Sequence, residues 1–293
     1  MSRTQKQTEN AFAFKWSKRE TYEGDYMEEK HRSWLVQRYF GSEEELNKFQ
    51  ENFRGKRFLD AGCGSGFSAL ALFREGLGGF IYTGIDISDA VSVAETRLRE
   101  SGIKGHFLKT DIGKYRPGEG FDVIFSEGVL HHTDKPYKSF KNLVRTLNPG
   151  GKILFYVYKK KAPMREYADD LIRERLNKYT DEESWERLLP LTRLGKKLGE
   201  LNAQIHIEED IDLLGIPGGE YDLQRFFYWF FVKAFYDPSY TMEQMNHINF
   251  DWYRPSNAFR FDPEEIREWV NRNKLKTDRF YVDESGISVV ASK

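Results

Sequence analysis

The chain has 293 residues and nearly balanced charge, 45 Lys and Arg against 46 Asp and Glu, so no general attraction to nucleic acid or anionic membranes is expected. Its longest apolar run, residues 226–232, is far too short to cross a membrane. The polar N-terminus shows no signal peptide, and a single cysteine excludes a disulfide framework, so we expect a cytoplasmic location.

Along the chain, residues 1–20 are polar with scattered rings and predict an extended arm, and residues 22–40 predict a helix. Alternating strands and helices follow from Lys56. The predicted strands are Arg57–Ala61, Phe80–Asp86, Gly105–Lys109, Phe121–Ser126 and Lys152–Tyr158, and the predicted helices are Ser65–Glu75, Asp89–Ser101 and Lys135–Thr146. Strands separated by helices indicate crossover connections and a mainly parallel sheet with helices on both faces.

This alternation of strands and helices stops after Tyr158. Residues 163–250 have helical periodicity but no convincing strand, and Pro190 predicts a helix break. The alternation resumes with an N-cap at Asp262, a helix to Asn273 and a hairpin of two strands, Lys276–Val282 and Ile287–Ala291. We therefore expect an arm and helix in residues 1–50, a core in 51–160, a helical insertion in 161–261 and the end of the core in 262–293.

A glycine-rich turn follows the first predicted strand, in "FLDAGCGSGFSALAL" (58–72). Glycines at such a turn allow the backbone to approach a ligand closely. The spacing Gly62-x-Gly64-x-Gly66 differs from the Gly-x-Gly-x-x-Gly of dinucleotide sites. By itself this turn is weak evidence for a ligand, and it could be purely structural.

Acidic residues near the ends of three successive predicted strands make the ligand more specific. Asp60 would repel a pyrophosphate but suits an ammonium group. Asp86, twenty-two residues after Gly64, is placed to accept hydrogen bonds from both hydroxyls of a ribose, and Asp111 is placed to accept one from an adenine amino group. Parallel strands end at one edge of a sheet, so these carboxylates favour a ligand with all three groups, S-adenosylmethionine.

Five segments of the chain resemble the successive motifs of class I S-adenosylmethionine-dependent methyltransferases, in particular the subgroup of ubiquinone and menaquinone biosynthesis. They are "FLDAGCGSG", "YTGIDIS", "KTDIGKY", "FDVIFSEGVLHHTDKP" and "LNPGGKILFYVY". The resemblance covers about residues 55–160 and implies a Rossmann-like α/β fold, with a doubly wound, seven-stranded sheet whose last strand is antiparallel. It is specific for the cofactor and the fold, and uninformative about the methyl acceptor.

The resemblance also implies cofactor contacts by position. Gly62, Cys63 and Gly64 would line the methionine part, Asp86 and Ile87 would hold the ribose and adenine, Asp111 and Ile112 would hold the adenine, and Ser126, Glu127 and Gly128 would lie beside the sulfonium. Asp60 joins this set as the expected partner of the ammonium group.

Methyl transfer requires that donor and acceptor be held close together with water excluded, and it needs a base only where the acceptor loses a proton. His131 and His132 follow the fourth strand and are the candidate catalytic residues; either they fix a loop by hydrogen bonds or one of them is a base. No cluster with metal-ligand spacing surrounds them, so no metal is predicted. Cys63 has no neighbouring base in the sequence and is not predicted to be a nucleophile.

Aromatic residues gather in the insertion, where fifteen of the forty-one residues from Tyr221 to Phe261 are Phe, Tyr or Trp. They predict either the core of a lid, a wall for an apolar or ring-bearing acceptor, or a homodimer interface. Tyr253 and Arg254 are the candidate acceptor-binding residues. The insertion begins after the fifth predicted strand, at the edge of the sheet where the acids lie. We therefore expect it to close over the cofactor, with the N-terminal arm as a second flap.

The function predicted is transfer of a methyl group from S-adenosylmethionine to an oxygen, nitrogen or carbon atom of a small molecule. A non-catalytic S-adenosylmethionine-binding protein and an RNA or protein methyltransferase are alternatives, and an NAD-dependent oxidoreductase is a minor one. The absence of a basic domain or tail argues against RNA.

Overall fold

The computed structural model describes residues 2–18, 21–22 and 25–293, which form two compact units. The sheet unit comprises Met1–Ser17, Glu23–Lys159 and Asn257–Lys293, and the insertion unit comprises Lys18–Tyr22 and Lys160–Ser256. In the described part of the chain, no helix has both the length and the apolarity needed to span a membrane.

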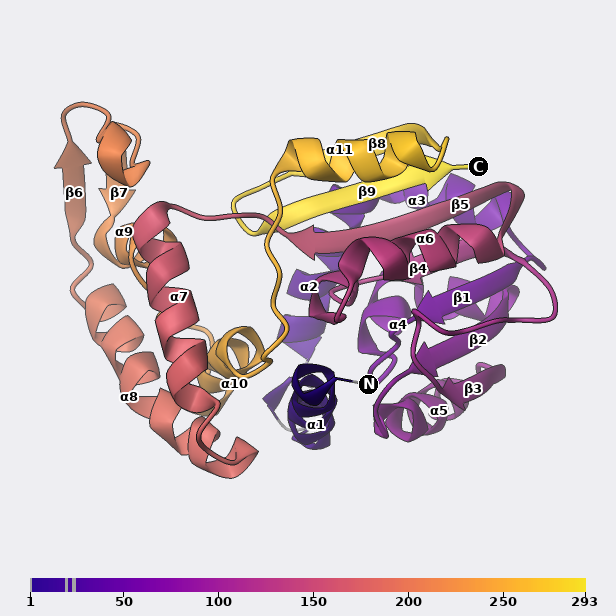
Figure 1. Ribbon diagram of the computed structural model, residues 1–293, viewed down its shortest axis with the longest axis horizontal. Coiled ribbons are helices and arrows are strands. Elements are labelled where there is room, and N and C mark those ends of the chain that lie inside the picture. Colours follow the sequence, from indigo (N-terminus) through magenta and orange to yellow (C-terminus); the bar gives the residue numbers. More distant parts are fainter. Residues whose placement is uncertain (1, 19–20, 23–24) are drawn as a thin grey trace. The chain divides into compact units, whose positions relative to one another are not determined.

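The sheet unit is built on seven strands in the order β3-β2-β1-β4-β5-β9-β8 (Figure 1). Their bounds are β1 Arg57–Ala61, β2 Ile81–Asp86, β3 Gly105–Lys109, β4 Phe121–Ser126, β5 Leu147–Tyr158, β8 Lys276–Val282 and β9 Gly286–Ser292. The first five strands are parallel, and β9 is antiparallel to β5 and β8. The predicted seven-stranded, mainly parallel sheet is confirmed. The chain order reverses at β1, which is where open α/β sheets bind ligands beyond their carboxyl ends.

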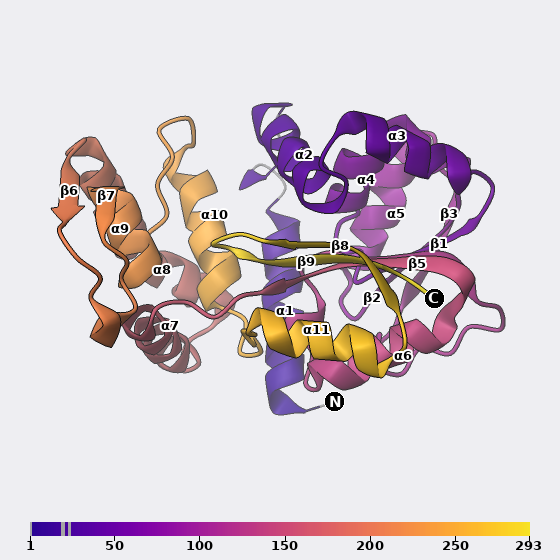
Figure 2. The ribbon, with the colours of Figure 1, turned by 90° about the horizontal axis from the view of Figure 1, so that it is seen from above.

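Helices cover both faces of this sheet, with α2, α3, α4 and α5 on one face and α6 and α11 on the other (Figure 2). Their bounds are α2 Asp25–Tyr39, α3 Glu43–Asn52, α4 Phe67–Phe73, α5 Ala90–Glu100, α6 Pro136–Thr146 and α11 Pro263–Arg272. Phe140 of α6 and Ile266 of α11 belong to a buried cluster with Ile124 and Ile153 of the central strands. Covered on both faces, these strands read as continuous apolar runs rather than alternating ones.

The N-terminal segment is a helix, α1 (Arg3–Ser17), so the predicted extended arm is wrong. The buried positions of α1 include Gln5, Thr8, Glu9 and Lys15, which share one helical face. Because most of these side chains are polar, the segment lacks the apolar stripe by which an amphipathic helix is recognised in a sequence.

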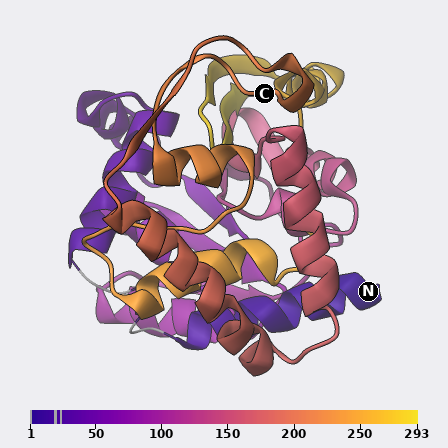
Figure 3. The same ribbon diagram turned by 90° about the vertical axis from the view of Figure 1, so that its left-hand side faces the viewer.

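Between Lys160 and Ser256, the insertion unit contains four α-helices and a short hairpin (Figure 3). They are α7 Pro163–Leu176, α8 Asp181–Glu200, α9 Leu223–Phe230 and α10 Met242–Tyr253, with β6 Gln204–Ile207 and β7 Gly219–Asp222. Thr192 of α8 donates a hydrogen bond to Asn246 of α10 and accepts one from Asn249. The hairpin corrects the prediction that this segment has no strand. Pro190 lies inside α8 on its exposed side, so the predicted break is also wrong; buried neighbours such as Leu188 hold the helix together.

Candidate active site

The loop after β1 is shaped by glycines with positive φ angles. Gly62 and Gly64 have φ angles of 90° and 51°. A Cβ atom on Gly62 would lie 2.4 Å from the Val129 side chain, and one on Gly64 would lie 2.9 Å from the Trp16 indole nitrogen. The backbone N–H groups of Gly62 and Cys63 donate to the Ile85 carbonyl at the end of β2. The loop therefore packs closely against its neighbours, and both strand ends are held together.

Asp60, next to the last residue of β1, is almost fully buried and accepts a hydrogen bond of 2.7 Å from the Tyr82 hydroxyl. Burial raises the pKa of Asp60 to about 7; the Tyr82 hydrogen bond opposes this shift, whereas the negative charges of Asp86 and Glu127 add to it. Three carboxylates are thus close enough to influence one another. A cation among them would relieve their repulsion.

Asp86 ends β2 and reaches back to the glycine loop. Its Oδ2 accepts from the Gly64 N–H at 2.9 Å, and its Oδ1 accepts from the N–H and hydroxyl of Ser88. Burial raises the pKa of Asp86, and these hydrogen bonds oppose the shift. The half-buried Ile87 follows it in the chain.

Asp111 and Ile112 follow β3 at the same edge of the sheet. The half-buried Asp111 carboxylate accepts a hydrogen bond of 2.8 Å from the Gly113 N–H. Ile112 is buried and packs within the hydrophobic core. The structure thus brings the carboxylates of Asp60 and Asp86 to one edge with Asp111, and contact of any of them with a cofactor stays a prediction.

The end of β4 is tied to helix α2 by a buried ion pair. The Glu127 carboxylate accepts from the Arg38 guanidinium and from the Tyr39 hydroxyl, each at 2.5 Å. The Arg38 guanidinium lies 3.5 Å from the ring centre of Trp34 and 4.3 Å from that of Tyr156. Arg38 and Tyr39 were missed by the sequence reasoning, because no local pattern links α2 to a residue about ninety positions away.

The two neighbours of Glu127 differ in role. Ser126 is buried and donates a hydrogen bond to the Ala61 carbonyl, which joins the ends of β4 and β1. Gly128 has a φ angle of 70°, and a Cβ atom there would meet open space.

The two histidines lie in a short 3₁₀ helix, Leu130–His132, and both are buried. Nδ1 of His132 is 2.5 Å from the Asn257 carbonyl oxygen, so this nitrogen carries a proton and donates. The His131 ring lies 3.8 Å from the Tyr158 ring, centre to centre. These contacts are those of loop-fixing residues, and the choice between that role and a base stays a prediction.

Cys63 lies in the glycine loop and is buried. Burial, and then the charges of Asp60 and Asp86, raise the pKa of this thiol well above its usual range. A thiol that stays protonated is a poor nucleophile, in keeping with a packing role.

Tyr253 and Arg254 lie in the insertion unit. Tyr253 is completely buried, and its hydroxyl accepts from the backbone N–H of Lys233. Arg254 is buried beside Asp181, with 2.6 Å between Nε and the carboxylate. Contact of either residue with an acceptor stays a prediction.

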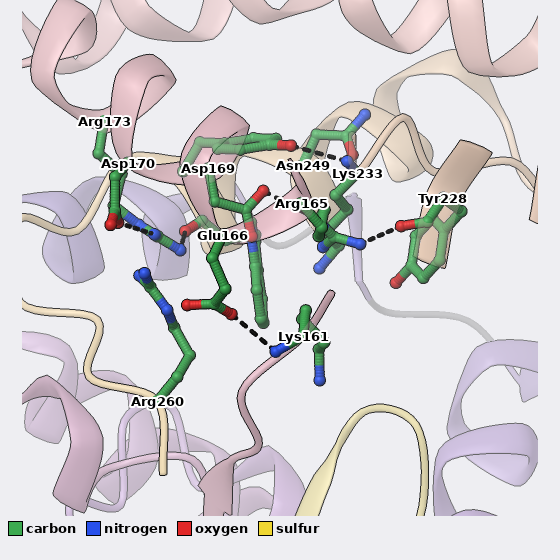
Figure 4. A network of polar contacts seen from close by, with 12 residues as sticks. Lys161, Arg165, Glu166, Asp169, Asp170, Arg173, Tyr228, Lys233, Asn249 and Arg260 are labelled. Carbon is green, nitrogen blue, oxygen red and sulfur yellow. Dashed lines mark hydrogen bonds and ion pairs between the residues drawn. The ribbon is translucent and has the colours of Figure 1, made fainter. Parts of the chain in front are cut away.

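The buried charged residues Arg165, Asp169 and Lys233 lie in the same unit, within a network of polar contacts (Figure 4). Asp169 accepts hydrogen bonds from Arg165 and from the Trp252 indole N–H. The Lys233 ammonium group lies 4.5 Å from the centre of the Trp252 ring. Burial lowers the pKa of Lys233 to about 7; the nearby Asp251 and Asp169 oppose the shift, and Arg165 and Arg173 add to it.

Comparisons with known proteins indicate the family of the domain that holds these residues. Residues 59–155 match the methyltransferase domain family. A ubiquinone biosynthesis O-methyltransferase of Coxiella burnetii is 32% identical over 108 residues, which is 36% of this chain and 45% of the relative. That of Saccharophagus degradans is 29% identical over 134 residues, 42% of this chain and 56% of the relative. The chain thus spans about half the length of these curated relatives.

Residues 59–155 form a class I S-adenosylmethionine-dependent methyltransferase domain. The predicted resemblance and the predicted cofactor, S-adenosylmethionine, are confirmed. The fold extends further than the domain: magnesium protoporphyrin IX methyltransferase from Synechocystis PCC 6803 with bound SAH superposes with a TM-score of 0.53. The two are 15% identical, and the match covers 99% of each chain, which shows a shared fold.

Proposed function

We propose that the protein transfers a methyl group from S-adenosylmethionine to a small-molecule acceptor. The observation that carries the proposal is the set of carboxylates at the carboxyl edge of β1, β2 and β4, where Asp86 and Glu127 both add to the raised pKa of Asp60. The Asp60 and Asp86 carboxylates suit a ligand that carries an ammonium group and ribose hydroxyls. When bound, S-adenosylmethionine supplies an electrophilic methyl group on its sulfonium.

The residues of the sheet unit fit this cofactor. Asp60 would hold the ammonium group, Gly62, Cys63 and Gly64 the methionine part, Asp86 and Ile87 the ribose and adenine, Asp111 and Ile112 the adenine, and Ser126, Glu127 and Gly128 would lie beside the sulfonium. The geometry of the site supports this assignment in one respect. Asp86 is already held by Gly64 and Ser88, so its lone pairs are oriented before a ligand arrives.

Catalysis in this proposal depends on positioning and on excluding water. Holding two reactants in near-attack geometry can be worth roughly 7–11 kcal/mol, and a displacement at a sulfonium needs little else. The Arg38–Glu127 pair and the packed His131 and His132 would keep the wall of the site rigid. One of the histidines would act as a base only for an acceptor that must lose a proton.

The insertion unit is proposed to contribute the acceptor site. The chain leaves the sheet unit after Lys159, directly beyond the carboxyl end of β5, and returns at Asn257. We propose that residues 161–261 act as a cap, that its aromatic side chains favour an apolar or ring-bearing acceptor, and that Tyr253 and Arg254 serve this site. A cytoplasmic location belongs to the same proposal, supported by the single, buried cysteine. A homodimer through the aromatic segment is a further arrangement to be tested.

The experiment has two steps. Calorimetry with S-adenosylmethionine should show binding at one site per chain. Incubation with the cofactor and a panel of small hydroxylated, amino and quinone-type aromatic acceptors should then form S-adenosylhomocysteine. A protein that binds the cofactor but forms product only with RNA or protein would overturn the acceptor class, and one that does not bind it would overturn the proposal.

A further inference from the structure

Helix α1 runs across the carboxyl edge of the sheet and contacts several strand ends. Gln5 donates a hydrogen bond to the His132 carbonyl beyond β4, and the ring of Trp16 lies against Gly64 beyond β1. Between them, the Glu9 carboxylate lies 3.6 Å from Nζ of Lys109, the last residue of β3. The inward face of α1 therefore borders the place where the cofactor residues meet.

Glu9 stands out on this face because it is an acid that is 5% exposed. Its Oε1 pairs with Lys6 at 3.0 Å and, at longer range, with Lys109. Its Oε2 is buried and has no hydrogen-bond partner among the described residues. A buried carboxylate oxygen without a donor is costly, so its retention calls for a partner that binds there.

The position of Glu9 indicates what that partner is. Its charge helps to raise the pKa of Asp86, so the two carboxylates lie within electrostatic reach of each other. Asp86 is the residue proposed to hold the ribose, and Lys109 marks the neighbouring strand, whose following loop is proposed to hold the adenine. The hydrogen-bond donors of a nucleoside are its two ribose hydroxyls and its adenine amino group. Each of them can donate a hydrogen bond to Oε2 of Glu9.

We infer that Glu9 is a cofactor-binding residue, whose Oε2 accepts a hydrogen bond from the nucleoside part of S-adenosylmethionine. The inference rests on the proposed function and extends it to a helix outside the matched domain. It makes α1 a part of the binding site rather than a passive cover. It also explains why a helix with a polar inner face is kept against the sheet.

The competing explanation is a structural ion pair. Lys6 and Lys109 are both substantially exposed, with side-chain exposures of 58% and 44%. Exposed ion pairs contribute about 0–1 kcal/mol, which is too little to offset the burial of a carboxylate. A structural Glu9 would stabilise the free protein, whereas a binding Glu9 is a burden to it until the ligand arrives.

The test compares Glu9→Gln and Glu9→Ala with the wild type by calorimetry and thermal unfolding. The probes are S-adenosylmethionine and methylthioadenosine, which has the nucleoside but no amino-acid part. Loss of one hydrogen bond to a charged group predicts that Glu9→Ala binds both probes about tenfold more weakly. The melting temperature of the ligand-free variants should be unchanged or higher.

Two control variants separate the causes. Asp89→Asn removes the other, exposed partner of Lys109 and should leave both affinities unchanged. Asp60→Asn should weaken S-adenosylmethionine more than methylthioadenosine, which lacks the ammonium group. If the wild type binds and the Glu9 variants bind equally well, or only lose stability, the inference alone is wrong. If the wild type binds neither probe, the proposed function is wrong, and so is the inference that rests on it.

Discussion

Oδ2 of Asp86 accepts a hydrogen bond of 2.9 Å from the backbone N–H of Gly64. This contact joins the end of β2 to the loop after β1 across twenty-two residues of chain. It positions both the acid and the loop through a contact within the protein itself. The entropic cost of ordering these groups therefore falls on folding and not on binding, and this increases the affinity for the ligand.

Asp86→Ala is expected to weaken S-adenosylmethionine binding at least about tenfold, because hydrogen bonds to a charged group are worth roughly 1.5–3 kcal/mol each. Calorimetry measures the affinity, and circular dichroism checks that the sheet is retained. Asp278→Ala is a matched control, since Asp278 is an acid on β8 that pairs with Lys152. Equal affinities of wild type and Asp86→Ala would remove Asp86 from the site.

Asp60 should make stability depend on pH. Burial raises its pKa from 3.8 to about 7, so between these values the folded protein keeps a proton that the unfolded chain has lost. The contribution is complete below pH 3.8 and is lost as the pH rises towards 7, with a slope of at most about 1.4 kcal/mol per pH unit. Urea unfolding of the wild type and of Asp60→Asn at several pH values measures it. Parallel profiles for the two proteins would contradict the shift.

Lys233 should act in the opposite sense. Its pKa falls from 10.5 to about 7, chiefly through burial, so the unfolded chain binds a proton that the folded protein lacks between these values. Stability from this group therefore rises with pH from about 7 to 10.5. Lys233→Met should raise the melting temperature at pH 6 and lose the advantage at high pH. Lys196→Met, at an exposed position, serves as the control. A gain that does not vary with pH would speak for packing alone.

The Arg38–Glu127 pair predicts a double-mutant result. Arg38→Met leaves the Glu127 carboxylate buried without its cation and should cost about 3–5 kcal/mol of unfolding free energy. Arg38→Met combined with Glu127→Gln should cost clearly less, because no charge is then stranded. Tyr39→Phe removes one hydrogen bond to the charged Glu127 carboxylate and should cost about 1.5–3 kcal/mol. Additive losses in the double variant would show that the two side chains are not coupled.

His132 predicts separate effects on stability and on the rate profile. His132→Ala removes the hydrogen bond to the Asn257 carbonyl and the contact with the Phe12 ring, and should lower stability by about 1–3 kcal/mol. If the residue only fixes its loop, the pH dependence of turnover should keep its shape. Loss of an ionisation near pH 6.5 in this variant alone would instead identify a base.

Much of the sheet could be predicted because its signals are local. Strands such as Arg57–Ala61 and Phe121–Ser126 have the predicted bounds, since closely spaced apolar residues between turn residues define each of them. Helix α1 could not be predicted, because Gln5, Thr8 and Glu9 occupy the buried positions where apolar residues are expected.

Part of the candidate site could likewise be predicted from the sequence, and part could not. The glycines follow β1, and the acids Asp60, Asp86 and Asp111 lie at or just beyond the carboxyl ends of β1, β2 and β3, so their common edge follows from the topology. The contacts of Glu127 with Arg38 and Tyr39 arise only from tertiary packing of α2 against the strand ends, and no sequence spacing encodes them.

The most direct test of the central claim is a crystal structure of the protein with S-adenosylhomocysteine. We predict that the ligand lies at the carboxyl edge of β1, β2 and β4, with Asp86 hydrogen-bonded to the ribose hydroxyls and Asp60 near the ammonium group. Glu9 of α1 should contact the nucleoside. A ligand bound at any other edge, or one bound at this edge without contact to Asp86, would contradict the proposed cofactor site.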